Sequence, residues 1–136
     1  AIEVTRKKIE RFSLDDRLKV TKGDLLKPLI KREIKNVDLV VSNPPYISEE
    51  EMDKLPPEVK KEPEKALYGG RAGLDIYKDL IPQSRQVLKD NGMLALEIGY
   101  QQAEAVKNIL VENNFKDIDV RKDYADKDRF IIAYKG

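Results

Sequence analysis

The stretch VDLVVSNPPYI at residues 37–47 joins a nearly continuous apolar run to a polar turn. An apolar run of this kind is typical of a strand that is covered on both faces, as in a parallel sheet. Proline cannot continue a central strand, so residues 37–42 are predicted to be a strand that ends at the turn. Ligands of open α/β sheets bind beyond the carboxyl ends of the strands, which makes this turn a candidate site.

The turn offers two oxygen acceptors to a planar NH2 group. Asn43 has a side-chain carbonyl, and the backbone carbonyl of Pro44 is a second acceptor, because prolines have a fixed φ and no N–H. Two acceptors on one NH2 favour a pyramidal nitrogen whose lone pair is free to attack an electrophilic methyl group. Tyr46 is expected to lie on the face of the planar group. The pattern predicts an amino- or amide-directed methyltransferase, and the alternative is an ordinary turn, since Asn and Pro are common turn residues.

The composition excludes several kinds of site. The 136 residues are the size of one domain. With 26 basic and 25 acidic residues the net charge is +1, which gives no bulk field to hold nucleic acid or an anionic membrane. The chain has no cysteine and no histidine, which excludes a disulfide framework, a thiolate nucleophile and a histidine-based triad or zinc site within it. No signal peptide or long apolar stretch is seen, which favours a cytoplasmic protein.

Hydrophobic periodicity predicts the other elements. Helical spacing is present at residues 1–12, 74–88 and 103–110, and strand-like runs are present at 18–21, 93–98, 118–121 and 129–134. The last two strands are predicted to form an antiparallel pair. The order of the elements predicts a mainly parallel α/β sheet that ends in this pair.

Three segments carry further expectations. Residues 28–36 are predicted to be irregular or a short helix, and Pro82 should kink or divide the helix around it. Asn91-Gly92 is interpreted as the stop of that helix. Ser48 to Arg71 is rich in Glu, Lys and Pro and follows the turn directly, so it is interpreted as a substrate-facing loop or lid, with plain disorder as the alternative.

A series of motifs extends from the turn to the end of the chain. Its members are Asn43-Pro44-Pro45-Tyr46-Ile47, Glu62-Pro63, Ala66-Leu67, Gly69-Gly70, Gly73-Leu74-Asp75-Ile76-Tyr77, Leu96-Glu97-Ile98-Gly99 with Gln101-Gln102, and Arg121-Lys122-Asp123-Tyr124 ahead of Asp128-Arg129. The series resembles the HemK/PrmC family, whose members methylate the side-chain amide of the glutamine in the Gly-Gly-Gln motif of peptide-chain release factors. The resemblance covers essentially the whole chain, whereas Asn-Pro-Pro-Tyr alone is shared with adenine- and cytosine-amino DNA methyltransferases. It implies a Rossmann-like fold that depends on S-adenosylmethionine.

The resemblance also implies roles for single residues. Asn43, Pro44 and Tyr46 would be catalytic, with Asn43 and Pro44 accepting the glutamine NH2 and Tyr46 packing on the amide. The substrate-binding set is Asn43, Pro44, Pro45, Tyr46, Glu62 and Pro63. The cofactor-binding set is Asp24, Leu25 and Asn43, with Asp24 near the adenine, whose exocyclic amine an aspartate can accept from. A turn role is the alternative for Asp24, Glu97 is expected to be structural, and no metal is expected.

Two parts of the family's pattern do not occur in these residues. They are the glycine-rich loop after the first strand and the acidic residue that ends the second strand. We therefore expect residues 1–136 to be the carboxyl-terminal portion of a methyltransferase catalytic domain, without its first two strands and without its amino-terminal substrate domain. In the family's sheet those strands lie between the strands at Leu18 and Val37, so the Val37 strand should have an open edge that allows self-association.

The residues leave three functions open. The first is methylation of a release factor, with the isolated chain expected to be inactive. The second is an amino-directed DNA or RNA methyltransferase, which should show a basic stripe that the balanced charge does not clearly offer. The third is a non-catalytic folded fragment.

Overall fold

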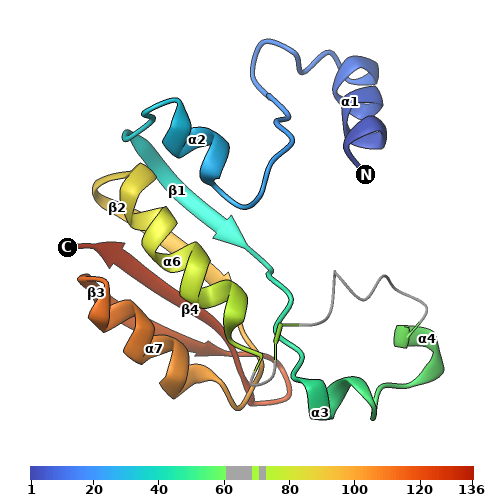
Figure 1. The fold of residues 1–136 in the computed structure, drawn as a ribbon, viewed down its shortest axis with the longest axis vertical. Coiled ribbons are helices and arrows are strands. Elements are labelled where there is room, and N and C mark those ends of the chain that lie inside the picture. Colours follow the sequence, from blue (N-terminus) through green and yellow to red (C-terminus); the bar gives the residue numbers. More distant parts are fainter. Residues whose placement is uncertain (61–68, 71–72) are drawn as a thin grey trace.

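The computed structural model of the chain describes residues 1–60, 69–70 and 73–136 (Figure 1). The elements in chain order are α1 (Ile2–Arg11), α2 (Lys27–Lys31), β1 (Val37–Ser42), α3 (Glu49–Met52), α4 (Pro57–Lys60), α6 (Asp75–Val87), β2 (Leu88–Glu97), α7 (Ala103–Glu112), β3 (Phe115–Lys122) and β4 (Asp128–Lys135). The strand predicted at residues 37–42 is confirmed with the same bounds. The predicted first and last helices are confirmed as α1 and α7, and a short helix, α2, lies in the segment 28–36.

The four strands form one mixed sheet in the order β1-β2-β4-β3. β1 is parallel to β2, whereas β4 is antiparallel to both β2 and β3. The antiparallel pair at the carboxyl end is therefore confirmed. In the described sheet β1, β2 and β3 run in the same direction and β4 alone runs against them, which agrees with the predicted mainly parallel sheet that ends in an antiparallel pair.

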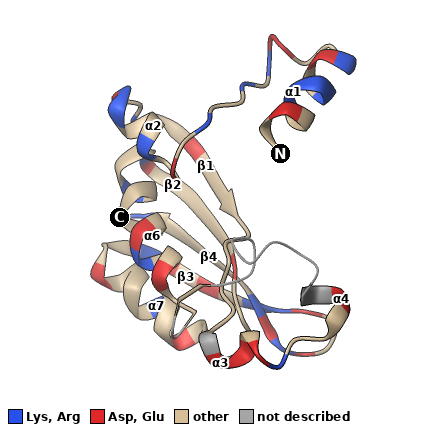
Figure 2. Ribbon diagram, turned by 45° about the vertical axis from the view of Figure 1, so that its right-hand side comes forward, with Lys and Arg blue, Asp and Glu red and all other residues tan. Residues whose placement is uncertain are grey.

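The segment between α1 and α2 does not form the strand predicted at residues 18–21. Leu18 is 46% exposed in this segment. A strand is stabilised by hydrogen bonds and side-chain pairs with a neighbour, and in the described sheet no strand pairs with these residues. The prediction is wrong because the alternation of apolar residues does not reveal whether a partner strand is within reach. Figures 1 and 2 both show α1 lying apart from the sheet.

The helices α6 and α7 cover one face of the sheet, and the hydrophobic core lies between them and the strands (Figure 1). The core includes Tyr77, Leu80, Ile81, Val87, Leu94, Leu96, Ile98, Val106, Leu110, Ile131 and Ala133. On the opposite face Leu39, Val41 and Phe130 are exposed. That face is not covered by a helix of the described residues, and none of these helices is long and apolar enough to cross a membrane.

The helix α6 continues through Pro82 as one element of 13 residues. A proline inside a helix costs about 3 kcal/mol. Ile81 and Val87 are fully buried, and burying such side chains contributes about 1.5–3 kcal/mol each. The predicted division is therefore wrong, since packing on the sheet outweighs the cost of the proline. The helix also ends at Val87, ahead of the stop predicted at Asn91-Gly92, which lies within β2.

Gln102 fixes the turn that follows β1. Its side-chain amide donates from Nε2 to the carbonyl oxygens of Tyr46 (2.9 Å) and Gly73 (3.1 Å). Its Oε1 accepts from the backbone N–H of Gly99 at 3.0 Å. A β-carbon at Gly73, which has a φ of +75°, would collide with the Tyr46 carbonyl oxygen, and one at Gly99 would come within 3.2 Å of the Tyr46 ring. The glycines of the motif series thus allow this close approach to the turn.

We expect Gln102→Glu to destabilise the protein. A carboxylate cannot donate to the two carbonyl oxygens, and leaving such groups without partners costs about 1–3 kcal/mol. The free energy of unfolding measured in urea should fall by about this amount. The matched control is Gln101→Glu at the exposed neighbouring position, which should change it by less than about 0.5 kcal/mol. Equal effects of the two substitutions would contradict the assigned role of Gln102.

Candidate active site

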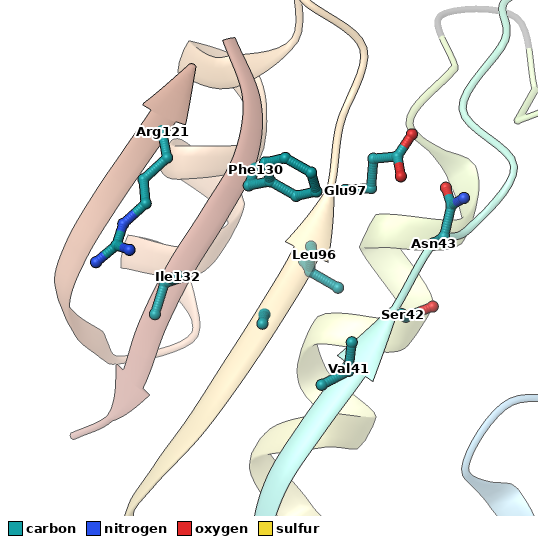
Figure 3. A pocket seen from close by; sticks show the side chains of 9 residues that line it. Val41, Ser42, Asn43, Leu96, Glu97, Arg121, Phe130 and Ile132 are labelled. Carbon is teal, nitrogen blue, oxygen red and sulfur yellow. The ribbon is translucent and has the colours of Figure 1, made fainter. Parts of the chain in front are cut away.

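The turn opens into a hollow of about 330 Å³ on the uncovered face of the sheet (Figure 3). The hollow is lined by Val41, Ser42, Asn43, Ala95, Leu96, Glu97, Arg121, Phe130 and Ile132. The register places Val41 beside Ala95 and Ala95 beside Ile132, so its floor is formed by three neighbouring strands. Figure 3 shows Asn43 and Glu97 at the same end of the hollow, where β1 and β2 both end.

The two predicted acceptors have no partner within the described part of the chain. Asn43 is exposed, and no hydrogen bond joins its side-chain amide to a described residue. Pro44 is buried, and its carbonyl oxygen likewise accepts no hydrogen bond there. In an ordinary turn the asparagine side chain would bond to nearby backbone. The exposed amide of Asn43 is therefore open to water or to a ligand.

Tyr46 is oriented by a polar network that the sequence did not predict. Its hydroxyl donates to Glu97 Oε1 at 3.2 Å and accepts from Arg129 Nη1 at 3.1 Å. Arg129 Nε in turn donates to Asp123 Oδ2 at 3.2 Å. Burial first, and the negative charge of Glu97 next, raise the pKa of Tyr46, so its hydroxyl stays a neutral donor. The backbone N–H of Lys127, with help from Arg129, lowers the pKa of Asp123.

Tyr46 does not line the hollow that Asn43 lines. It lines a second hollow of about 320 Å³, together with Ile47, Leu55, Tyr100, Arg129 and others. Glu97 connects the two sites, because it lines the first hollow and binds the tyrosine of the second. The expected structural role of Glu97 is thus incomplete, since its side chain faces the candidate site. In the sequence, the position of Glu97 at the end of a predicted strand, within Leu-Glu-Ile-Gly, was the feature that could have indicated a place in the site.

The structure does not bring the proposed adenine contact to either hollow. Asp24 is exposed and forms a 2.8 Å ion pair with Lys27, a contact that raises the pKa of the lysine. This arrangement fits the alternative of a turn aspartate. Leu25 is partly buried and packs against the core.

The other predicted substrate residues have different outcomes. Pro45 is half-buried, and its carbonyl oxygen lies so close to Gly69 that a β-carbon there would come within 2.5 Å of it. Glu62 and Pro63 lie outside the described residues, as does most of the segment predicted to be a loop or lid after α4. Among the residues that the structure describes, no group of three or more acidic side chains could hold a metal ion.

Comparison with known proteins places the chain in a family. Residues 3–118 match the family model described as Eco57I restriction-modification methylase. A release factor glutamine methyltransferase of Clostridium acetobutylicum is 46% identical over all of this chain and 48% of the relative. The Aquifex aeolicus protein of the same name is 40% identical over 99% of this chain and 47% of its own length. The chain thus spans about half the length of the curated relatives it matches.

Two solved structures share the fold. A methyltransferase from Pyrococcus furiosus has a TM-score of 0.63 at 18% identity, over 99% of this chain and 57% of its own. The E. cuniculi Mtq2-Trm112 complex, described as responsible for the methylation of the eRF1 translation termination factor, has a TM-score of 0.56 at 23% identity, over 85% of this chain and 60% of its own. These similarities confirm the Rossmann-like methyltransferase fold. The chain belongs to the Eco57I restriction-modification methylase family and, as its motifs predicted, resembles the HemK/PrmC release factor glutamine methyltransferases.

Proposed function

We propose that this chain is the acceptor-binding part of a methyltransferase that modifies the glutamine side-chain amide in the Gly-Gly-Gln motif of a peptide-chain release factor. The observation that carries this proposal is the unpartnered pair of acceptors, the Asn43 amide and the Pro44 carbonyl, at the carboxyl end of β1. The names of the relatives support the substrate. Because release factors act in translation, the proposed place of action is the cytoplasm.

The chemistry of these residues is mainly positioning. Asn43 Oδ1 and the Pro44 carbonyl oxygen would accept the two N–H groups of the substrate amide, which frees the nitrogen lone pair for attack on a methyl carbon. Holding the nitrogen in line with that carbon supplies much of the rate in reactions of this kind. No base needs to act first, because the methylated nitrogen is acidic and can lose its proton to water. Tyr46, held by Glu97 and Arg129, would limit where the amide can lie.

The residues present fit part of a site for S-adenosylmethionine, which supplies the methyl group when bound. A hollow of about 330 Å³ is near the lower end of the range of small-molecule sites, roughly 300–1,000 Å³. Its lining is largely apolar, with Asn43 at its end. Asn43 would contact the cofactor from this hollow, whereas Asp24 and Leu25, in the loop before α2, do not line it. The chain has no glycine-rich loop of the kind that wraps the methionine portion.

The charge distribution favours a protein substrate over nucleic acid. Figure 2 shows both basic and acidic residues on α1 and distributed over the other elements of the described chain. Several of the basic side chains are paired, as in Lys54 with Glu50 and Lys89 with Asp38. A nucleic-acid site needs unpaired cations in a stripe to replace counterions on the phosphates.

We expect Asn43→Ala to lower turnover strongly. Removing one preorganised hydrogen-bonding group from a transition state costs about 10²–10³-fold in kcat. The measurement is transfer of labelled methyl to a release factor, by a protein of the relatives' full length that contains this chain. Cofactor affinity should stay nearly unchanged. Asn36→Ala, at an exposed position just ahead of β1, is the control and should retain activity, whereas parallel loss of turnover and cofactor affinity in Asn43→Ala would make Asn43 merely structural.

The same full-length protein should label a release factor and not duplex DNA. The physical reason is the balanced surface charge, which gives weak and nonspecific attraction to phosphates at physiological salt. Both acceptors should be offered at equal concentration with labelled cofactor, and the product separated by nuclease and protease digestion. Label that survives protease and is lost with nuclease would replace the proposal with the DNA alternative.

We also propose that the 136-residue chain associates with itself through β1. In the described sheet β1 pairs only with β2, which leaves its other edge open. Leu39 and Val41 beside that edge are 48% and 68% exposed. Sedimentation velocity should show a concentration-dependent dimer that Val41→Lys weakens. The control Val111→Lys, at a 57% exposed site on α7, should not weaken it, and a monomer at all concentrations would exclude the association.

A further inference from the structure

The motif Arg121-Lys122-Asp123-Tyr124 with Asp128-Arg129 reaches Tyr46 from the terminal hairpin. Asp123 follows β3, and Arg129 lies in β4, so both belong to the terminal hairpin. Arg129 Nη1 lies 3.1 Å from the Tyr46 hydroxyl, across 83 positions of sequence. From the other side Glu97, at the end of β2, accepts from the same hydroxyl.

The hairpin turn itself fixes the Asp123 carboxylate. Its Oδ1 accepts from the backbone N–H groups of Ala125 (2.8 Å) and Lys127 (3.2 Å), which leaves Oδ2 for Arg129. The ion pair is only 26% and 24% exposed at Arg129 and Asp123. A pair that is partly shielded from water is screened less than the exposed ion pairs of the surface. The contact with Asp123 thus orients the Arg129 guanidinium toward the Tyr46 hydroxyl.

The two charged groups that contact the Tyr46 hydroxyl come from different elements, and Glu51, Lys54 and Tyr100 line the same hollow as Tyr46. Glu97 comes from β2 and Arg129 from β4, and Asp123 stands behind Arg129. Tyr77 of α6 donates to the backbone oxygen of Glu97 at 2.6 Å and so holds the acceptor in place. The hydroxyl oxygen of a tyrosine lies on the axis of χ2, so these two hydrogen bonds restrict χ1 and fix the direction in which the Tyr46 ring extends.

We propose that Arg129, held by Asp123, and Glu97 are positioning residues that fix the Tyr46 ring, and with it the acceptor turn, for the substrate amide. Gln102 holds the backbone of Tyr46, and the network holds its far end. Together they fix both ends of the residue that follows the acceptor prolines. The role in catalysis rests on the proposed function, but the network itself does not.

The network is tested on the 136-residue chain by titrating tyrosine labelled with ¹³C at Cζ, with the Tyr46 signal assigned by its loss in Tyr46→Phe. A nearby carboxylate disfavours the tyrosinate, so Glu97→Gln should lower the pKa of Tyr46. Arg129→Met removes a favourable cation and should raise it. Lys122→Met removes a charge from the same hairpin and should leave it unchanged.

Asp123→Asn is the second variant, for the case that Arg129→Met does not fold. It keeps the side-chain volume, weakens the hold on Arg129, and should also raise the pKa of Tyr46. Unchanged titration of Tyr46 in both Glu97→Gln and Asp123→Asn overturns the proposal. The proposal is also overturned if Glu97→Gln or Asp123→Asn changes the pKa of Tyr46 by no more than the control Lys122→Met does.

The catalytic part is tested in a protein of the relatives' full length that contains this chain. Arg129→Met should lower kcat about tenfold or more, as misplacement of a reacting group does, with the KM for the cofactor unchanged. Arg129→Lys keeps the charge without the planar fork and should recover only part of the loss. If Tyr46 titrates as expected and no release factor is methylated, the proposed function fails while the network stands. If methylation is normal in Arg129→Met, the positioning role fails.

Discussion

The side-chain amide of Gln102 is the contact on which the candidate site depends. It joins the turn after β1, the segment ahead of α6 and the segment after β2 through three hydrogen bonds. A turn that contains two prolines has few N–H groups of its own to anchor it. One amide that both donates and accepts replaces the missing backbone bonds. Gln102 thereby fixes the backbone at Tyr46, two residues after Pro44.

The site combines a rigid support with an open surface. The helices α6 and α7 bury the core face of the sheet, whereas the face that carries Asn43 and the first hollow is uncovered in the described residues. Relatives of about twice this length have further sequence that these residues do not match. In the proposed function the chain would supply the binding groups for an amide together with one wall of a cofactor site.

The charged side chains near the turn after β1 are paired with one another. Asn43 and Pro44, the proposed acceptors, are neutral, and the charged groups Glu97, Arg129 and Asp123 compensate one another around Tyr46. A neutral amide can then bind without meeting an unpaired buried charge, whose desolvation would be costly. The proton of Tyr46 stays in place because burial and Glu97 both raise its pKa.

The sequence by itself determined the strand at residues 37–42, the first and last helices, the antiparallel hairpin and the turn after the strand, because each depends on local periodicity or on proline geometry. Tertiary structure alone decided that residues 18–21 are not a strand, since a strand needs a neighbour, and that α6 continues through Pro82, since packing offsets the lost hydrogen bond. It also decided the partners of Tyr46, which lie 51 and 83 positions away. These contacts form only when β2 and β4 pair in the folded sheet. A local sequence pattern therefore does not predict them.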